Sequence, residues 1–206
     1  MFRFKRLEWA AALALLLTLV VSAAYMRFAS AEQSALAEKM VRLHVLANSD
    51  SAEDQARKLR VKDAVFARTE ELLRAASDQA EAERLLAAAL PELRRLAVET
   101  LRANGGEEEV TVELTDADFT TRYYDCFTLP AGSYRALRVT IGEGKGQNWW
   151  CVVFPPLCSA EETLEEAATR AAFSDEELRL IRSGEARYLL RFRSLELLQR
   201  LKGMLK

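Results

Sequence analysis

The side chains of this sequence best suited to chemistry are one histidine and three cysteines. His44 is the only histidine, and the cysteines are Cys126, Cys151 and Cys158. A cysteine hydrolase needs a thiolate, a histidine that activates it and a third group that orients the histidine, a part that Asp50 could take. No hydrolase signature surrounds any cysteine. A Cys/His hydrolase acting on peptide or cell wall is therefore an alternative and not the leading hypothesis.

Metal, nucleotide and acid–base sites find no support in the residue spacing. Zinc needs several cysteines and histidines close together, and the chain has one histidine and no C-x-x-C pair. The glycine-rich segment 142–146 lacks the serine or threonine that follows the lysine of a phosphate loop. The acidic residues of 161–166 are typical of a solvated helix face. We therefore expect no metal, no cofactor and no enzymatic activity.

The N-terminus has the three parts of an export signal. Basic residues lie within positions 3–6, an uncharged apolar run follows at 9–24, and small residues occupy positions 29 and 31. The run is short for a bilayer core of roughly 30 Å, so we expect cleavage after Ala31, with an uncleaved membrane anchor as the alternative. In both cases the basic residues stay in the cytoplasm and residues 32–206 are exported. The formal net charge of −2 makes nucleic acid an improbable partner.

Three cysteines in an exported chain favour one bridge and one free thiol. Cys151 and Cys158 flank Pro155 and Pro156, a rigid turn that can fold the chain back on itself. A disulfide needs Cα atoms within about 7 Å, so these two cysteines are the predicted pair. We expect Cys126, in a segment rich in β-formers, to be a buried small apolar residue.

The hydrophobic periodicity predicts one exported α+β domain over 32–206. Helices are expected from Ser51 to about 76 and over 79–103, the second with a buried stripe of Leu86, Leu90, Leu93, Ala97 and Leu101. Two shorter helices, capped at Ser159 with Glu162 and at Ser174 with Glu177, are expected to end near 172 and 182. Strands are expected at 41–47, 110–114, 119–129, 134–141, 149–154 and 187–193, with a last helix from Ser194. An antiparallel meander with the helices packed mainly on one face is the simplest arrangement.

Strand alternation also predicts where two unusual side chains point. His44 faces away from the apolar side of strand 41–47, so we expect it at the sheet surface or paired with Asp50 or Glu53. Trp149 and Trp150 are adjacent and must face opposite sides of the sheet. One of them could be an interface anchor, while burial of both between sheet and helices is the slightly favoured alternative.

Two stretches of the chain have a distinctive residue pattern, "RLHVLANSDSAEDQARKLRVKDAV" (42–65) and "GEGKGQNWWCVVFPPLC" (142–158). Together they resemble the signatures of the stage II sporulation protein R family of endospore-forming Firmicutes. The first contains His44, Asn48, Ser49, Asp50 and Gln55. The second contains Trp149, Trp150, Cys151, Pro155, Pro156 and Cys158. The order of the two segments, the exported N-terminus and the chain length agree with this resemblance.

The resemblance implies a function that composition does not reveal. Members of the family are exported from the forespore into the space between the two membranes of the sporangium. There they activate a membrane-embedded aspartic protease of the mother cell, which removes the pro-sequence of sigma-E. We hypothesise that the two signatures form one contact surface for that protease. A membrane-anchored envelope scaffold is the second alternative, and it requires that residues 1–31 remain attached.

Overall fold

The computed structural model describes residues 2–158 and 163–182. The predicted strand 187–193 and the helix from Ser194 lie outside the described residues. The helices are α1 (Phe2–Ala37), α2 (Ala52–Leu73), α3 (Gln79–Ala103), α4 (Leu164–Arg170) and α5 (Asp175–Ile181). The strands are β1 (Val41–Leu46), β2 (Val110–Phe119), β3 (Arg122–Tyr123), β4 (Thr128–Leu129), β5 (Gly132–Ile141) and β6 (Asn148–Phe154). The α+β class is confirmed.

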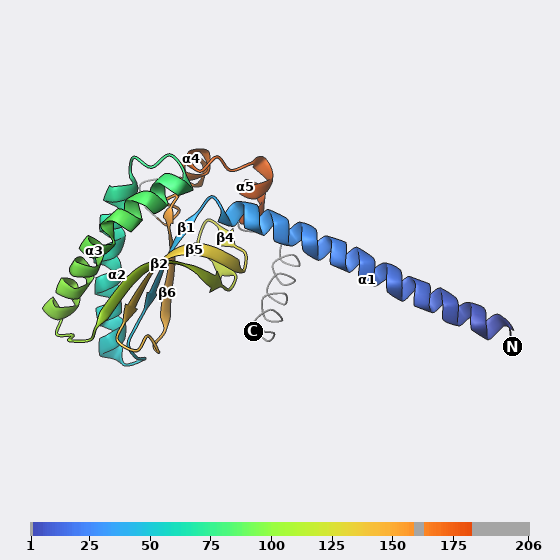
Figure 1. The fold of residues 1–206 in the computed structure, drawn as a ribbon, viewed down its shortest axis with the longest axis horizontal. Helices are drawn as coiled ribbons and strands as arrows, with labels where there is room; N and C mark the ends of the chain where they lie inside the picture. Colours follow the sequence, from blue (N-terminus) through green and yellow to red (C-terminus); the bar gives the residue numbers. More distant parts are fainter. Residues whose placement is uncertain (1, 159–162, 183–206) are drawn as a thin grey trace.

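A four-stranded sheet in the order β2-β5-β1-β6 forms the centre of the domain (Figure 1). The pairs β2–β5 and β1–β6 are antiparallel, whereas β1 and β5 run parallel. The predicted meander is therefore corrected, because β1 inserts between two strands that follow each other in the sequence. Five of the six residues of β1 are buried. The central position of β1 covers both of its faces, including the one that carries Arg42 and His44.

The two long helices α2 and α3 cover one face of the sheet, as the apolar stripes predict (Figure 1). Val41, Leu43 and Val45 of β1 are fully buried on this face. The predicted stripe of α3 is buried at Leu86 and Leu93 and continues to the end of the helix. Pro91 lies inside α3, and the helix continues past it to Ala103.

The opposite face of the sheet is also covered, which the sequence did not predict in full. The C-terminal end of α1, the β3–β4 hairpin and the short helices α4 and α5 pack there (Figure 1). Their core includes Leu36, Met40, Phe127 and Leu180. This second layer decides the surroundings of every side chain on the far side of β1.

Helix caps set the starts of the helices close to the predicted positions. Ser51 caps α2 through a hydrogen bond from the Asp54 backbone N–H. Ser174 and Glu177 form the predicted capping box of α5. For α4 the cap is Thr163, paired with Glu166, whereas the predicted cap at Ser159 lies outside the described residues.

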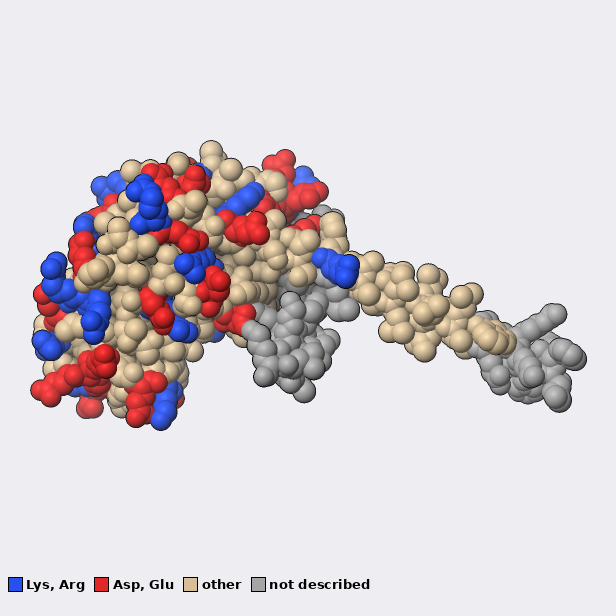
Figure 2. All heavy atoms as spheres, in the orientation of Figure 1, with Lys and Arg blue, Asp and Glu red and all other residues tan. Residues whose placement is uncertain are grey.

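The first helix projects far from the domain (Figure 1). Within it, Ala11–Ala37 is long and apolar enough to cross a membrane, with a mean hydropathy of 1.9. Figure 2 shows little charge along the described part of this projection, while both signs cover the domain. The helix is thus a candidate export signal or membrane anchor. Cleavage after Ala31 remains a prediction, and Leu36 beyond that point is fully buried in the domain.

Candidate functional site

The fold brings the two signature segments together along one strand pair. In the β1–β6 ladder His44 lies opposite Trp150. The turn after β1 then meets the turn before β6, where the Gly146 backbone N–H donates to the Ala47 carbonyl at 2.9 Å. The Gln147 backbone N–H donates to Asp50 Oδ1 at 2.7 Å. Segments about a hundred residues apart in the sequence thus form one continuous edge of the domain.

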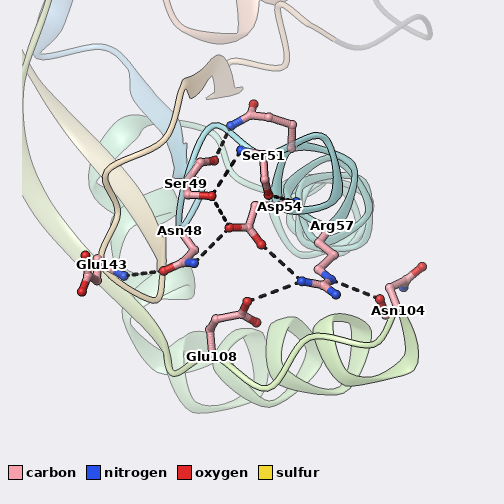
Figure 3. Close-up of polar contacts among 9 residues, drawn as sticks. Asn48, Ser49, Ser51, Asp54, Arg57, Asn104, Glu108 and Glu143 are labelled. Carbon is pink, nitrogen blue, oxygen red and sulfur yellow. Dashed lines mark hydrogen bonds and ion pairs between the residues drawn. The ribbon is translucent and has the colours of Figure 1, made fainter.

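Asp54, in the first turn of α2, holds the segment after β1 in place (Figure 3). Its Oδ2 accepts hydrogen bonds from the Asn48 amide at 2.9 Å and the Ser49 hydroxyl at 2.6 Å. Its Oδ1 lies 3.2 Å from Nη1 of Arg57. The hydrogen bond from Ser49 is the largest of the effects that lower the pKa of Asp54. The network therefore depends on an ionised carboxylate.

Further contacts extend this network to the second signature and to α3. The Asn48 side-chain oxygen accepts from the Glu143 backbone N–H at 3.1 Å (Figure 3). Arg57 donates to the Asn104 carbonyl at 3.3 Å, past the end of α3. Lys58 is buried and donates to Gln55 Oε1 at 2.6 Å and to the Gln147 carbonyl at 2.9 Å. Gln55 Nε2 donates to the Ser49 carbonyl at 2.9 Å. Asn48 and Gln55 of the first signature thus hold the backbone instead of presenting a reactive group.

We expect Asp54→Asn to lower the free energy of unfolding by about 2 kcal/mol at neutral pH, because the amide loses charge-assisted hydrogen bonds. The pKa of Asp54 is lower in the folded than in the unfolded protein. Its contribution is therefore complete above the ordinary carboxyl pKa and is lost as the pH falls through the folded value. Urea unfolding across the acid range should show this loss in the native chain and a smaller one in Asp54→Asn. The control is Asp63→Asn, which removes an exposed carboxylate. Equal effects of the two substitutions would contradict the stabilising role of Asp54.

His44 is buried, with 8% of its surface exposed, which corrects the expectation of a surface or cap position. Its ring stacks on Trp150, with centroids 3.8 Å apart and planes 15° from parallel. Phe119 lies at 5.9 Å on a tilted plane. Neither ring nitrogen has a hydrogen-bond partner of good geometry among the described residues, so His44 pairs with neither Asp50 nor Glu53. His44 is buried because the second layer of helices and the β3–β4 hairpin covers its face of the sheet.

Burial is the main reason that the pKa of His44 falls to about 4. The positive charges of Arg138, Arg42 and Arg122 lower the pKa further, and the nearby Asn148 side chain opposes the fall. His44 is therefore a neutral ring at physiological pH. An imidazole stacked and enclosed in this way is poorly placed to take a proton from a thiol.

The two tryptophans of β6 have opposite surroundings, as strand alternation predicts. Trp150 is half-buried in the aromatic layer with His44 and contacts Phe119 edge-on at 4.7 Å. Trp149 is 38% exposed, and the Lys62 ammonium lies 4.7 Å from the centroid of its ring. The alternative in which both tryptophans are buried is therefore wrong. Trp149 is the member of the pair that a partner could contact.

Cys126, Cys151 and Cys158 are all free thiols in the structure. Cys126 is exposed, which contradicts its predicted burial, because the short β3–β4 hairpin leaves its tip at the surface. Cys151 is buried and Cys158 is half-buried, and the two thiols are hydrogen-bonding neighbours. The predicted bridge between them stays a prediction. No group of acidic, histidine and cysteine side chains in the described part of the chain is arranged to hold a metal ion.

The remaining signature residues are divided between the surface and the interior. Asp50 is exposed and Ser49 is half-buried. Pro155 is buried after a cis peptide bond and Pro156 is half-buried. Sequence reasoning missed Lys58 and Gly146 as parts of this edge. A basic residue on the apolar side of a helix, and a glycine beside a strand end, were the signals that could have pointed to them.

Comparisons with known proteins agree with the two signatures. A family model described as stage II sporulation protein R matches residues 37–164. Stage II sporulation protein R of Bacillus subtilis (strain 168) is 38% identical over 130 residues, which are 63% of this chain and 58% of that relative. The chain thus matches little more than half the length of this relative. No solved structure matches the chain.

Proposed function

Since the chain belongs to the stage II sporulation protein R family, and so to a family of sporulation proteins, we propose that it is an exported intercellular signal. On this proposal it acts between the two membranes of the sporangium. Its target is the membrane-embedded aspartic protease of the mother cell that processes the sigma-E precursor. The protein activates this protease by binding and performs no catalysis itself.

The observation that carries the proposal is the merging of both signatures into one edge, on a domain attached to an apolar helix. The exposed side chains of that edge are those of Asp50, Lys145, Gln147, Asn148 and Trp149, which we call the turn surface. The network around Asp54 fixes the backbone beneath it. A rigid patch with a central aromatic anchor is typical of a protein-binding site.

The hydrolase alternative receives less support than the signalling one. His44 would have to activate a cysteine, yet its pKa is lowered to about 4 and its ring is covered by Trp150. The histidine of the first signature therefore contributes to recognition indirectly, by seating β6 against β1.

The decisive experiment is co-expression of the chain, the candidate protease and the sigma-E precursor in a host that does not sporulate. We expect the precursor to be shortened, as seen by immunoblot, only when all three are present and the chain is exported. A version that lacks residues 1–31 should stay in the cytoplasm and fail to activate. Processing without this chain, or full processing by the cytoplasmic version, would refute the proposal.

We expect Trp149→Ala to reduce precursor processing in this assay at least about tenfold, as for an interface hot spot. Leu59→Ala is the matched control, because Leu59 is an apolar side chain with a similar exposed fraction of 40% but on α2. Both variants should be exported in equal amounts. Processing that is equally low in both variants would show that the turn surface has no special role.

A retained anchor distinguishes the scaffold alternative from the signal. If the chain is a lasting envelope scaffold, its N-terminal helix stays attached. A partner protein should then co-purify with the chain throughout sporulation. A released signal instead loses the segment before Ala31, which mass spectrometry of the mature protein would detect.

A further inference from the structure

All three cysteines of the chain line one cavity of about 520 Å³ beside β6, the edge strand of the sheet. One wall comes from α2 with Lys62 and Phe66, and the other comes from the β3–β4 hairpin with Tyr124. The indole rings of the tryptophan pair complete the lining. This volume lies in the range of sites that bind small molecules. Trp149 of the turn surface also lines this cavity, but the proposed signalling role uses none of the three cysteines.

The two neighbouring thiols of the cavity are not equivalent. Cys158 Sγ accepts a hydrogen bond from the Val152 backbone N–H at 3.3 Å. The hydrogen bond from the Cys151 thiol is the largest effect that lowers the pKa of Cys158, and the Arg42 charge adds to it, while burial and Glu70 oppose. The same hydrogen bond and burial raise the pKa of Cys151. Cys158 is thus the better thiolate and Cys151 holds its proton.

The charge that favours the Cys158 thiolate is built into the core. Arg42 is fully buried, and its guanidinium carbon lies 3.9 Å from the ring centroid of Phe119. Its Nη2 donates to the Tyr124 hydroxyl at 2.8 Å, while Nε and Nη1 hydrogen-bond to no described residue. A buried cation without full compensation favours a nearby anion. Tyr124 joins this cation to the wall of the cavity.

We propose that Cys151 and Cys158 are an exchangeable dithiol, oxidised by a small organic disulfide that binds in this cavity. The Cys158 thiolate attacks one sulfur of the disulfide, and the S–S bond breaks. A mixed disulfide forms on Cys158, and the first thiolate leaves and takes up a proton. Cys151 then attacks Cys158 Sγ and gives up its proton, the mixed disulfide bond breaks, and the second thiolate leaves and takes up that proton. The two cysteines lose two electrons and the organic disulfide gains them.

The structure holds the reduced form, and the product is the bridge that the sequence predicts. Closing it ties the chain after Pro155 and Pro156 to β6. Cys126, exposed at the rim, has no partner thiol in hydrogen-bond contact in the described part of the chain.

The test uses the reduced full-length chain in detergent micelles, with Cys126→Ser as background and oxidised glutathione as the probe. Samples are quenched in acid, alkylated after denaturation and mapped by mass spectrometry. We expect a Cys151–Cys158 bridge and two released glutathiones per chain. With Cys151→Ser added, a glutathione adduct should accumulate on Cys158. With Cys158→Ser added instead, the adduct on Cys151 should form at least about tenfold more slowly.

Three results would overturn the proposal. The first is equal reactivity of Cys151 and Cys158, and the second is reaction of either cysteine only after denaturation. The third is faster oxidation by a strongly oxidising protein disulfide, such as oxidised protein disulfide isomerase, than by glutathione, because the proposal requires a small disulfide seated in the cavity. A serine variant that does not give the native circular dichroism spectrum is not used. In that case the reaction of the native chain with oxidised glutathione is quenched early, and the first glutathione adduct must be found on Cys158. No protease takes part, so the outcome is independent of the signalling proposal.

Discussion

Replacing Trp150 with alanine is expected to lower the free energy of unfolding by about 3 kcal/mol, because it leaves a cavity in the aromatic layer. The same change uncovers His44, which now stacks on that ring at 3.8 Å. The pKa of His44 should then rise from about 4 toward its ordinary value of 6.5. The chain has one histidine, so a single imidazole signal in an NMR titration measures the shift.

The pH dependence of stability follows from the same shift. The folded pKa of His44 lies below the unfolded value, so between about 4 and 6.5 only the unfolded chain binds this proton. Folding is therefore most favoured above pH 6.5 and loses stability as the pH falls to about 4. The Trp150→Ala variant should lose much of this dependence. The loss due to Asp54 occurs at lower pH and can be separated from it.

Trp149→Ala is the matched control, since it removes the same side chain from the neighbouring position. Trp149 is 38% exposed and lies outside the aromatic layer, so its removal should change stability much less and leave the pKa of His44 at about 4. Two variants with equal stability loss and the same histidine titration would contradict the arrangement described here.

Replacing Gly146 with alanine is expected to separate the two signature segments. The added Cβ would lie 2.6 Å from the Ser49 carbonyl carbon and 2.9 Å from the Ala47 Cβ, and it would overlap the Ser49 carbonyl oxygen. Backbone cannot move aside as a flexible side chain does, so we expect a loss of about 3 kcal/mol and of the hydrogen bond from Gly146 to Ala47. Urea unfolding measures the first effect, and hydrogen exchange at the Gly146 amide measures the second.

The neighbouring Lys145→Ala gives the control for this turn. The Lys145 side chain is exposed and pairs only with Glu143 at the surface among the described residues, so its loss should change the free energy of unfolding little. Precursor processing should fall in Gly146→Ala by more than the folded fraction explains, because Trp149 and Asp50 are displaced. If Gly146→Ala is as stable as Lys145→Ala and as active as the native chain, the close packing of the two turns is not needed.

Local patterns in the sequence located the long helices and most of the strands, but the single strand predicted at 119–129 is wrong. The structure has the end of β2, then the short strands β3 and β4, in that range. The apolar stripe of α3 and the caps at Ser51 and Ser174 depend on residues three or four positions apart, so a short window contains their cause. Alternation likewise placed Trp149 and Trp150 on opposite sides of β6. The apolar character of α1 and the signatures of the family are also contained in short stretches of residues.

The sequence by itself determined most of the described elements, the apolar first helix and the family, because each is a property of neighbouring residues. Only the tertiary structure decided that β1 lies between β5 and β6 and that a second layer encloses His44. It alone showed an exposed Cys126 and a cavity that Cys126 shares with the other two cysteines. These features depend on which distant segments pack together. That choice is made by burial of apolar area over the whole domain, and periodicity within one segment does not encode it.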